Sequence, residues 1–304
     1  MASSRAPEVA VGQAPAFGRA RSARRYARAT WRLIRRKPLG MAGLLILLVV
    51  AFGALFAPVI APYSYDQTRF TSRLLSPSWS HPFGTDNLGR DTFTRILYGA
   101  RVSLGISAGA VVLAKSIATV IAITSGFYGG WLDKLGQRLV DIWIALPTLI
   151  ILVTLIGMIG SSPGSLVAII ALANAPGSSR VIRSVVVSVR EEPYVEAGRA
   201  IGANDARLMF RYILPNIAHI VIYSSTVTLG SVILIVASLG FLGYGVPPPH
   251  PDLGGMLSGD GLTFMRRQPW LAVWPGVTIT LVVFAFNVFG DALRDLLDPR
   301  LRGS

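Results

Sequence analysis

Long uninterrupted apolar runs dominate the chain from residue 38 onward. A helix that spans a bilayer needs about 20 consecutive apolar residues. Such continuous runs lack the alternation of a transmembrane β-strand, so the pattern predicts an all-α integral membrane protein. We expect six transmembrane helices, at residues 40–61, 102–125, 139–160, 165–187, 216–245 and 271–293.

Charged residues inside these runs need an explanation. The fourth span is uninterrupted only before Arg180, so we expect its helix to leave the membrane there and to continue into the cytoplasm. Lys115 lies in the middle of the second span, where a charge costs about 3 kcal/mol. It either lines a polar pathway or pairs with another helix or subunit, and pairing is the simpler interpretation. Asp141 is expected to pair with Arg138, three residues earlier.

Charge sets the orientation of the spans. The chain is 52% hydrophobic and 14% charged, against about 25% charged in soluble domains, yet its net charge is +14. With both termini in the cytoplasm, cytoplasmic segments hold 21 basic residues and external segments hold seven. This bias predicts cytoplasmic termini. We interpret residues 1–37 as a basic cytoplasmic tail, partly disordered, that acts as a topology signal on anionic lipid rather than as a nucleic-acid binder.

The sequence offers no site for catalysis. It has no phosphate-binding G-x-x-x-x-G-K-[ST] motif, no G-x-S-x-G and no H-E-x-x-H. It has no cysteine, which excludes disulfides and Cys-ligated zinc, and its three histidines are scattered. We therefore expect no enzyme, and no metal or cofactor on this chain.

One charged, helix-prone stretch, "EEPYVEAGRAIGANDARLMFRYILPN" at residues 191–216, interrupts the apolar runs. Pro193 suits the first turn of a short helix that Gly202 would end. Asn204 is a plausible cap for a second short helix, and Pro215 predicts a bend where the chain re-enters the bilayer. Such a stretch is either an amphipathic loop on lipid or a docking site for a soluble partner. The predicted apolar face of the second helix consists of Ala206, Met209, Phe210 and Ile213.

This stretch resembles the cytoplasmic signature Glu-Ala-Ala, three residues, Gly, nine residues, Ile-x-Leu-Pro of membrane subunits in bacterial ABC importers. It departs from the signature at Gly198, where the family has its second Ala, and at Tyr212, where the family has Ile. The resemblance implies an ATPase-coupling loop at residues 188–215. The expected contact residues are Glu196, Ala197, Gly198, Gly202, Met209, Phe210, Leu214 and Pro215.

Three further stretches resemble the C-type permease of oligopeptide, dipeptide and nickel importers: "HPFGTDNLGRDTFTRILYGARVSL", "SLGFLGYGVPPPHPDLGGML" and "FNVFGDALRDLLDPRLR". Together with the loop they cover most of residues 38–302. The resemblance implies the type I ABC importer permease fold in a bacterial plasma membrane. It also implies four kinds of partner besides the lipid bilayer: a homologous B-type permease, two cytoplasmic ATPases that hold ATP and Mg²⁺, and an external substrate-binding protein.

The expected organisation is a tail at 1–37, the first span and an external segment at 38–101, a five-helix core at 102–293 and a cytoplasmic tail at 294–304. Peptide is the expected cargo; nickel or another small solute is the alternative within the family. A gradient-driven channel or secondary transporter is the rival class, but the spans carry few acidic groups for proton coupling. In the external segment, Asp86, Arg90 and Asp91 either dock the binding protein or brace the outer ends of the spans.

Overall fold

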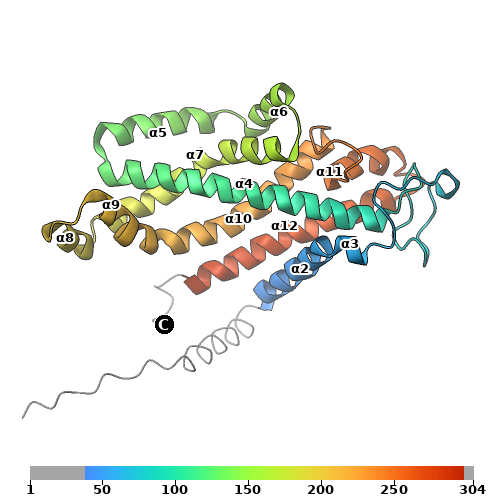
Figure 1. Ribbon diagram of the computed structural model, residues 1–304, viewed down its shortest axis with the longest axis horizontal. Coiled ribbons are helices and arrows are strands. Elements are labelled where there is room, and N and C mark those ends of the chain that lie inside the picture. Colours follow the sequence, from blue (N-terminus) through green and yellow to red (C-terminus); the bar gives the residue numbers. More distant parts are fainter. Residues whose placement is uncertain (1–37, 298–304) are drawn as a thin grey trace, which may run out of the picture. The chain divides into compact units, whose positions relative to one another are not determined.

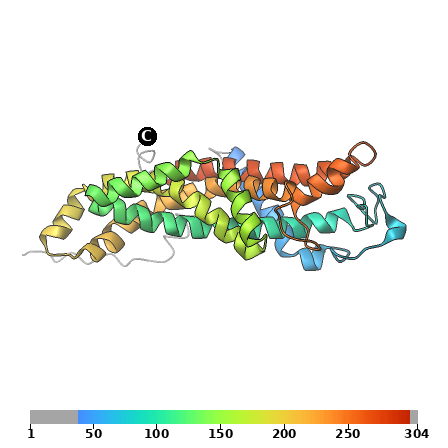
Figure 2. The same cartoon turned by 90° about the horizontal axis from the view of Figure 1, so that it is seen from above.

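The computed structural model describes residues 38–297, and the expectations for the tails at 1–37 and 298–304 lie outside that range. Within it, apart from one isolated bridge between Thr85 and Asp91, the regular structure is helical, as predicted. The long helices run along one common direction (Figures 1 and 2). Five helices are long and apolar enough to cross a membrane, and a sixth span results if two consecutive helices that meet at a sharp bend, residues 130–145 and 148–159, count as one.

The elements are α2 (Pro38–Leu55), α3 (Ala57–Ile60), a 3₁₀ turn (Phe70–Ser72), α4 (Thr92–Tyr128), α5 (Gly130–Ala145), α6 (Thr148–Ile159), α7 (Pro163–Arg190), α8 (Pro193–Ala200), α9 (Asp205–Arg207), a π-helical turn (Leu208–Ile213), α10 (Leu214–Phe241), α11 (Leu253–Met256), a second π-helical turn (Leu257–Gly261) and α12 (Trp270–Leu297).

The third predicted span, 139–160, is not one helix. It consists of the second half of α5 and the whole of α6, and the two helices meet at an angle of 86°. Leu146 adopts an extended conformation (ψ 137°) ahead of Pro147. A proline disfavours the helical conformation in the residue before it, which is why the apolar run breaks here.

The fifth span is longer than predicted. Helical structure continues from Asp205 to Phe241, over 37 residues, so the predicted second short helix is the first part of a membrane span. Pro215, where a bend was predicted, lies inside this continuous helical segment, and the bend itself stays a prediction. The π-helical turn at residues 208–213 comes just before this proline, and the Leu214 amide donates to Met209 O, five residues back. A π turn changes the hydrogen-bond register, and here it carries the helix past a residue that has no N–H to donate.

Small residues allow the long helices to approach one another closely. On α4, Ala118 and Ala122 are fully buried, and a Cβ on Gly126 would lie 2.8 Å from Val186 Cγ1 of α7. Similarly, a Cβ on Gly43 of α2 would lie 2.8 Å from a backbone oxygen of α12. Helix pairs in membranes associate through such close backbone packing, because lipid is as apolar as the side chains themselves.

Two ion pairs join α5 to α7. Asp133 binds Arg183, and Asp141 lies 3.0 Å from a terminal guanidinium nitrogen of Arg180. The expected pair between Asp141 and Arg138 is therefore wrong. The acid lies opposite α7 instead, and its partner comes from a neighbouring helix rather than from its own.

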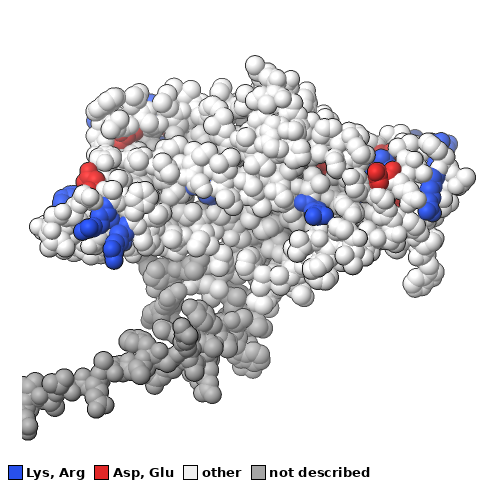
Figure 3. Space-filling model, viewed as in Figure 1, with Lys and Arg blue, Asp and Glu red and all other residues white. Residues whose placement is uncertain are grey.

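On the face shown in Figure 3, charged side chains gather toward the two ends of the helices and are sparse between them. We refer to these ends by their short helices, as the α8 end and the α11 end. In Figure 1, α2 begins and α12 ends on the side of the α8 end. An uncharged band between two charged ends is the pattern of a protein that crosses a bilayer.

Candidate functional site: the α8 hairpin and the α11 end

The α8 hairpin, residues 191–215, is built by local signals. Pro193 starts α8, as its fixed φ suits the first helical turn. Gly202 follows the helix with φ +80°, the Gly202 amide donates to Arg199 O and the Ala203 amide donates to Gly198 O, both at 3.0 Å. This pair of bonds is a Schellman motif, in which a left-handed residue ends the helix. The predicted helix stop is confirmed.

The second arm of the hairpin also begins as predicted. The side-chain oxygen of Asn204 accepts a hydrogen bond from the Arg207 amide at 2.9 Å, which is the geometry of an N-cap. From this cap the chain runs through α9 and the π-helical turn directly into α10. The hairpin is therefore attached to a membrane span by continuous helix.

Gly198 brings the two arms together. It is buried, and a Cβ there would lie 3.0 Å from Leu208 Cδ2 and 3.4 Å from the Tyr212 ring. Alanine, the residue of the family signature, would require these side chains to shift by a few tenths of an ångström. The glycine thus has a packing role that its low helix propensity does not reveal.

The hairpin packs on the membrane helices through one apolar cluster. Val195 of α8, Leu208 and Ile213 of the second arm and Ile217 of α10 have no exposed surface. They pack against alanines and Phe127 of α4 and against Ile182 and Val186 of α7. Burial of each such side chain contributes about 1.5–3 kcal/mol. The hairpin and the ends of α4, α7 and α10 are consequently one packed unit.

The predicted apolar face of the second arm is divided. Ile213 is buried and Met209 is half-buried, whereas Phe210 is 68% exposed and Ala206 is exposed. The π-helical turn explains the error, because it places residues five apart above one another and so aligns Leu208 with Ile213. Phe210 then points away from the cluster.

The exposed surface of the hairpin combines apolar and charged groups. Glu196, Ala197 and Pro215 are exposed and Leu214 is half-buried. Gly202 is exposed as well, and a Cβ added to it would meet no atom of the described residues within 4 Å. Two exposed apolar residues were missed by the sequence reasoning, Ile201 (80%) and Tyr194 (40%). The sequence marks them only weakly: Ile201 is a single apolar residue beside Gly202, and Tyr194 follows Pro193.

At the α11 end, Asp86 and Asp91 turn inward. Asp86 is 4% exposed; it accepts hydrogen bonds from the amides of Leu88 (2.9 Å) and Arg90 (2.8 Å) and from Arg90 Nε (2.6 Å). Its second ion pair, to Arg95 Nε, spans 3.7 Å. These contacts hold the loop before α4 in place.

Asp91 fixes the start of α4. It is 3% exposed, accepts the Thr94 amide at 2.8 Å as the N-cap, and lies 2.9 Å from His81 Nδ1. The His81 ring stacks on Tyr63, with centroids 4.9 Å apart. Because both carboxylates are buried in internal contacts, these contacts support the bracing interpretation. Docking of a binding protein at this segment stays a prediction.

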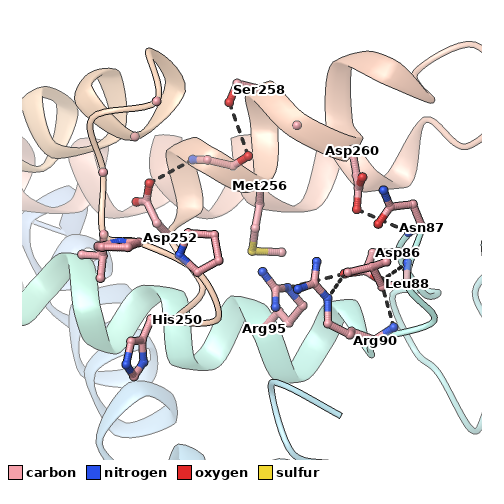
Figure 4. A pocket seen from close by; sticks show the side chains of 18 of the residues that line it. Asp86, Asn87, Leu88, Arg90, Arg95, His250, Asp252, Met256, Ser258 and Asp260 are labelled. Carbon is pink, nitrogen blue, oxygen red and sulfur yellow. Dashed lines mark hydrogen bonds and ion pairs between the residues drawn. The ribbon is translucent and has the colours of Figure 1, made fainter. Parts of the chain in front are cut away.

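A cavity of about 620 Å³ lies beside this network. Figure 4 shows Arg95 and Met256 between the Asp86–Arg90 pair and the segment that follows α10. Figure 4 shows Asp260 beside Asn87 and Asp86, and its carboxylate accepts a hydrogen bond from the Asn87 backbone amide at 3.3 Å. Burial raises the pKa of Asp260 above its ordinary value. The lining of the cavity includes both acidic and basic side chains, among them Asp86, Arg90 and Arg95.

The fold and the apolar spans define a polytopic helical membrane protein, and comparison with known proteins gives its family. Residues 118–303 match the family described as the binding-protein-dependent transport system inner membrane component. Residues 25–77 match the N-terminal transmembrane domain of oligopeptide transport permease C. The chain belongs to the C-type permeases of the oligopeptide and dipeptide group of ABC importers, and it is a multi-pass protein of the bacterial plasma membrane.

Individual relatives cover nearly the whole chain. The dipeptide transport system permease protein DppC of Alkalihalophilus pseudofirmus is 40% identical over 275 residues, 90% of each chain. DppC of Haemophilus influenzae is 37% identical over 278 residues, 90% of this chain and 94% of its own. The glutathione transport system permease protein GsiD of Escherichia coli is 35% identical over 274 residues, 90% of each chain.

Proposed function

We propose that this chain is one of two permease subunits of an ATP-driven importer of peptides and forms half of the translocation pathway. The proposal extends to this chain the dipeptide and glutathione transport for which its relatives are named. The partners would be a B-type permease, two ATPase subunits that carry ATP and Mg²⁺, and an external binding protein. No cofactor is assigned to this chain.

The α8 end would face the cytoplasm, with residues 1–37 and 294–304 on the same side. The ratio of 21 to seven basic residues in the whole sequence supports this orientation. The segment within 38–101 that follows the first span would face outward, where a binding protein arrives. The core of residues 102–293 would carry the pathway.

The observation that carries the coupling role is the continuity of the α8 hairpin with a membrane span. Helix runs from Asp205 to Phe241, and the hairpin shares one apolar cluster with α4 and α7. A packed helical unit moves as a body, because its interior tolerates little deformation. An ATPase that displaces Glu196, Ala197 or Phe210 on the exposed side would therefore move three membrane helices together.

The function is tested with the complete complex, made of both permeases, the ATPases and the binding protein, in proteoliposomes. We expect dipeptide uptake that requires ATP and stops when the ATPases carry an inactivating substitution of the catalytic glutamate. Uptake driven by an ion gradient without ATP would refute the proposal. ATP-dependent uptake of nickel but not of peptide would support the proposed ATP-driven importer and refute peptide as its cargo.

Orientation is tested with single cysteines, since the chain has none of its own. Thr71→Cys and Ala197→Cys both introduce a thiol at an exposed position, one at each end. In intact cells an impermeant thiol reagent should label Cys at position 71 and not at 197. The reverse labelling would invert the topology.

A further inference from the structure

A second cavity, of about 430 Å³, lies among the membrane spans. Helices α4, α7 and α10 and the bend between α5 and α6 line it. This volume lies within the range of pockets that hold small organic ligands, about 300–1,000 Å³. Its polar lining includes Thr148, Asn174, Ser178, Ser224, Thr228 and Ser231.

The cavity contains a buried ammonium without a counter-ion among the described residues. Lys115 of α4 is 6% exposed, and within residues 38–297 its hydrogen-bond partner is the neutral hydroxyl of Ser178 on α7, at 3.1 Å. None of the described residues that line the cavity is acidic. A charge inside a membrane protein is normally paired or faces a water-filled pathway, so this ammonium requires an anion or water.

Two further features of the lining favour an anion. The indole N–H of Trp143 is buried and has no acceptor within the described part of the chain, although the side chain lines the cavity. The 12-residue helix α6 begins at Thr148, also in the lining. The amides at a helix start carry partial positive charge and favour a carboxylate. The lining thus offers three kinds of donor, and the bend at Pro147 creates one of them by exposing the start of α6.

We propose that this cavity binds the carboxylate of the transported peptide, with Lys115 as its counter-ion and the Trp143 N–H as a second donor. This inference rests on the proposed function, and it names the group of the cargo that the permease recognises. The rival for the same ammonium is an acid of the partner permease.

The first test is uptake of a dipeptide by the complete complex with Lys115→Met. We expect uptake to fall about 10-fold or more, since charge-assisted hydrogen bonds are among the strongest in proteins. Trp143→Phe, which removes the N–H and keeps an aromatic ring, should raise the peptide concentration for half-maximal uptake several-fold. Lys134→Met is the matched control, because Lys134 is exposed at the start of α5 and should tolerate the change.

The second test uses Lys115→Cys in a complex whose other subunits lack cysteine. Reaction with an aminoethyl thiosulfonate restores a cation at this position and should restore uptake, whereas a methyl thiosulfonate adds a neutral group and should not. Dipeptide under transport conditions should slow the reaction at position 115 several-fold. It should leave the reaction of Lys134→Cys unchanged.

Three results would overturn the inference: equal rescue by the neutral adduct, labelling at position 115 that peptide does not slow, or failure of the Lys115→Met chain to assemble with the partner permease. The last result would assign Lys115 to a contact between subunits. The unmodified complex separates the two proposals. If it transports peptide while any of these results holds, only the carboxylate site fails; if it transports no peptide, the proposed function fails as well.

Discussion

Phe210→Ala gives the most direct measure of the proposed contact between the α8 hairpin and an ATPase. The ring is 68% exposed, so it contributes little to the fold of this chain and most of its surface is available to a partner. Burial of a whole phenylalanine side chain contributes about 1.5–3 kcal/mol. About two-thirds of that remains to be gained on docking, or roughly 1–2 kcal/mol. Since 1.4 kcal/mol is a factor of ten in affinity, the ATPase should bind about 5–30-fold more weakly to the variant.

The assay is a titration of labelled ATPase subunit onto the permease pair in nanodiscs, with the dissociation constant as readout. Phe52→Ala is the matched control, because Phe52 is 58% exposed but lies on the apolar α2. It should leave the dissociation constant unchanged. Thermal unfolding of both variants should match that of the parent chain. A dissociation constant for Phe210→Ala within twofold of the parent, or equal weakening by Phe52→Ala, would refute the reasoning.

Four other outcomes are expected. Gly202→Leu forces a bulky residue into φ +80°, at a cost of about 1–2 kcal/mol, and should abolish the ATP hydrolysis that the binding protein stimulates. Gly202→Asn should keep most of this stimulated hydrolysis, because asparagine tolerates the conformation. Normal stimulation with Gly202→Leu would contradict the prediction. Gly198→Val should lower the melting temperature more than Gly198→Ala, because its side chain separates the two arms; equal melting would show that they are not in contact. Asp91→Ala removes the cap of α4 and should cost at least about 0.5–2 kcal/mol in detergent unfolding, whereas Asp91→Asn should lose less. Burial raises the pKa of Asp260, so its ionisation opposes folding. The stability that Asp260 contributes is complete below the ordinary aspartate pKa and is lost as pH rises through the raised pKa, and Asp260→Asn should remove this contribution from the dependence of melting temperature on pH.

Local signals in the sequence were sufficient for the hairpin. Pro193, Gly202 and Asn204 act on backbone groups within three or four residues, so their effects do not depend on the rest of the fold. The start of α8, its stop and the cap of the second arm all appear in the structure as predicted. The family signature added the expected role of the hairpin in coupling to an ATPase.

The apolar runs predicted where the membrane helices lie but not their shape, since the structure has, within residues 38–297, five candidate spans, or six if the bent pair α5–α6 is one span. A run of about 20 apolar residues must cross the bilayer or be buried, whatever its neighbours are. The apolar run does not predict whether the helix continues through a proline or breaks there. Pro147 breaks its span at 86°, Pro176 lies inside the continuous helix α7, and Pro215 follows a π-helical turn without a break.

The sequence by itself determined the fold class, the membrane spans and the corner of the α8 hairpin, because these follow from backbone chemistry and burial over short distances. Only the tertiary structure decided which side chains face one another. It paired Asp141 with Arg180 across two helices, turned Phe210 outward and left Lys115 facing a cavity without an acid among its described lining. The Asp141 pair and the surroundings of Lys115 depend on the stagger and rotation of packed helices, and one helix's sequence does not contain the position of its neighbour. The orientation of Phe210 depends on the π-helical turn, which the α-helical period of the sequence does not predict.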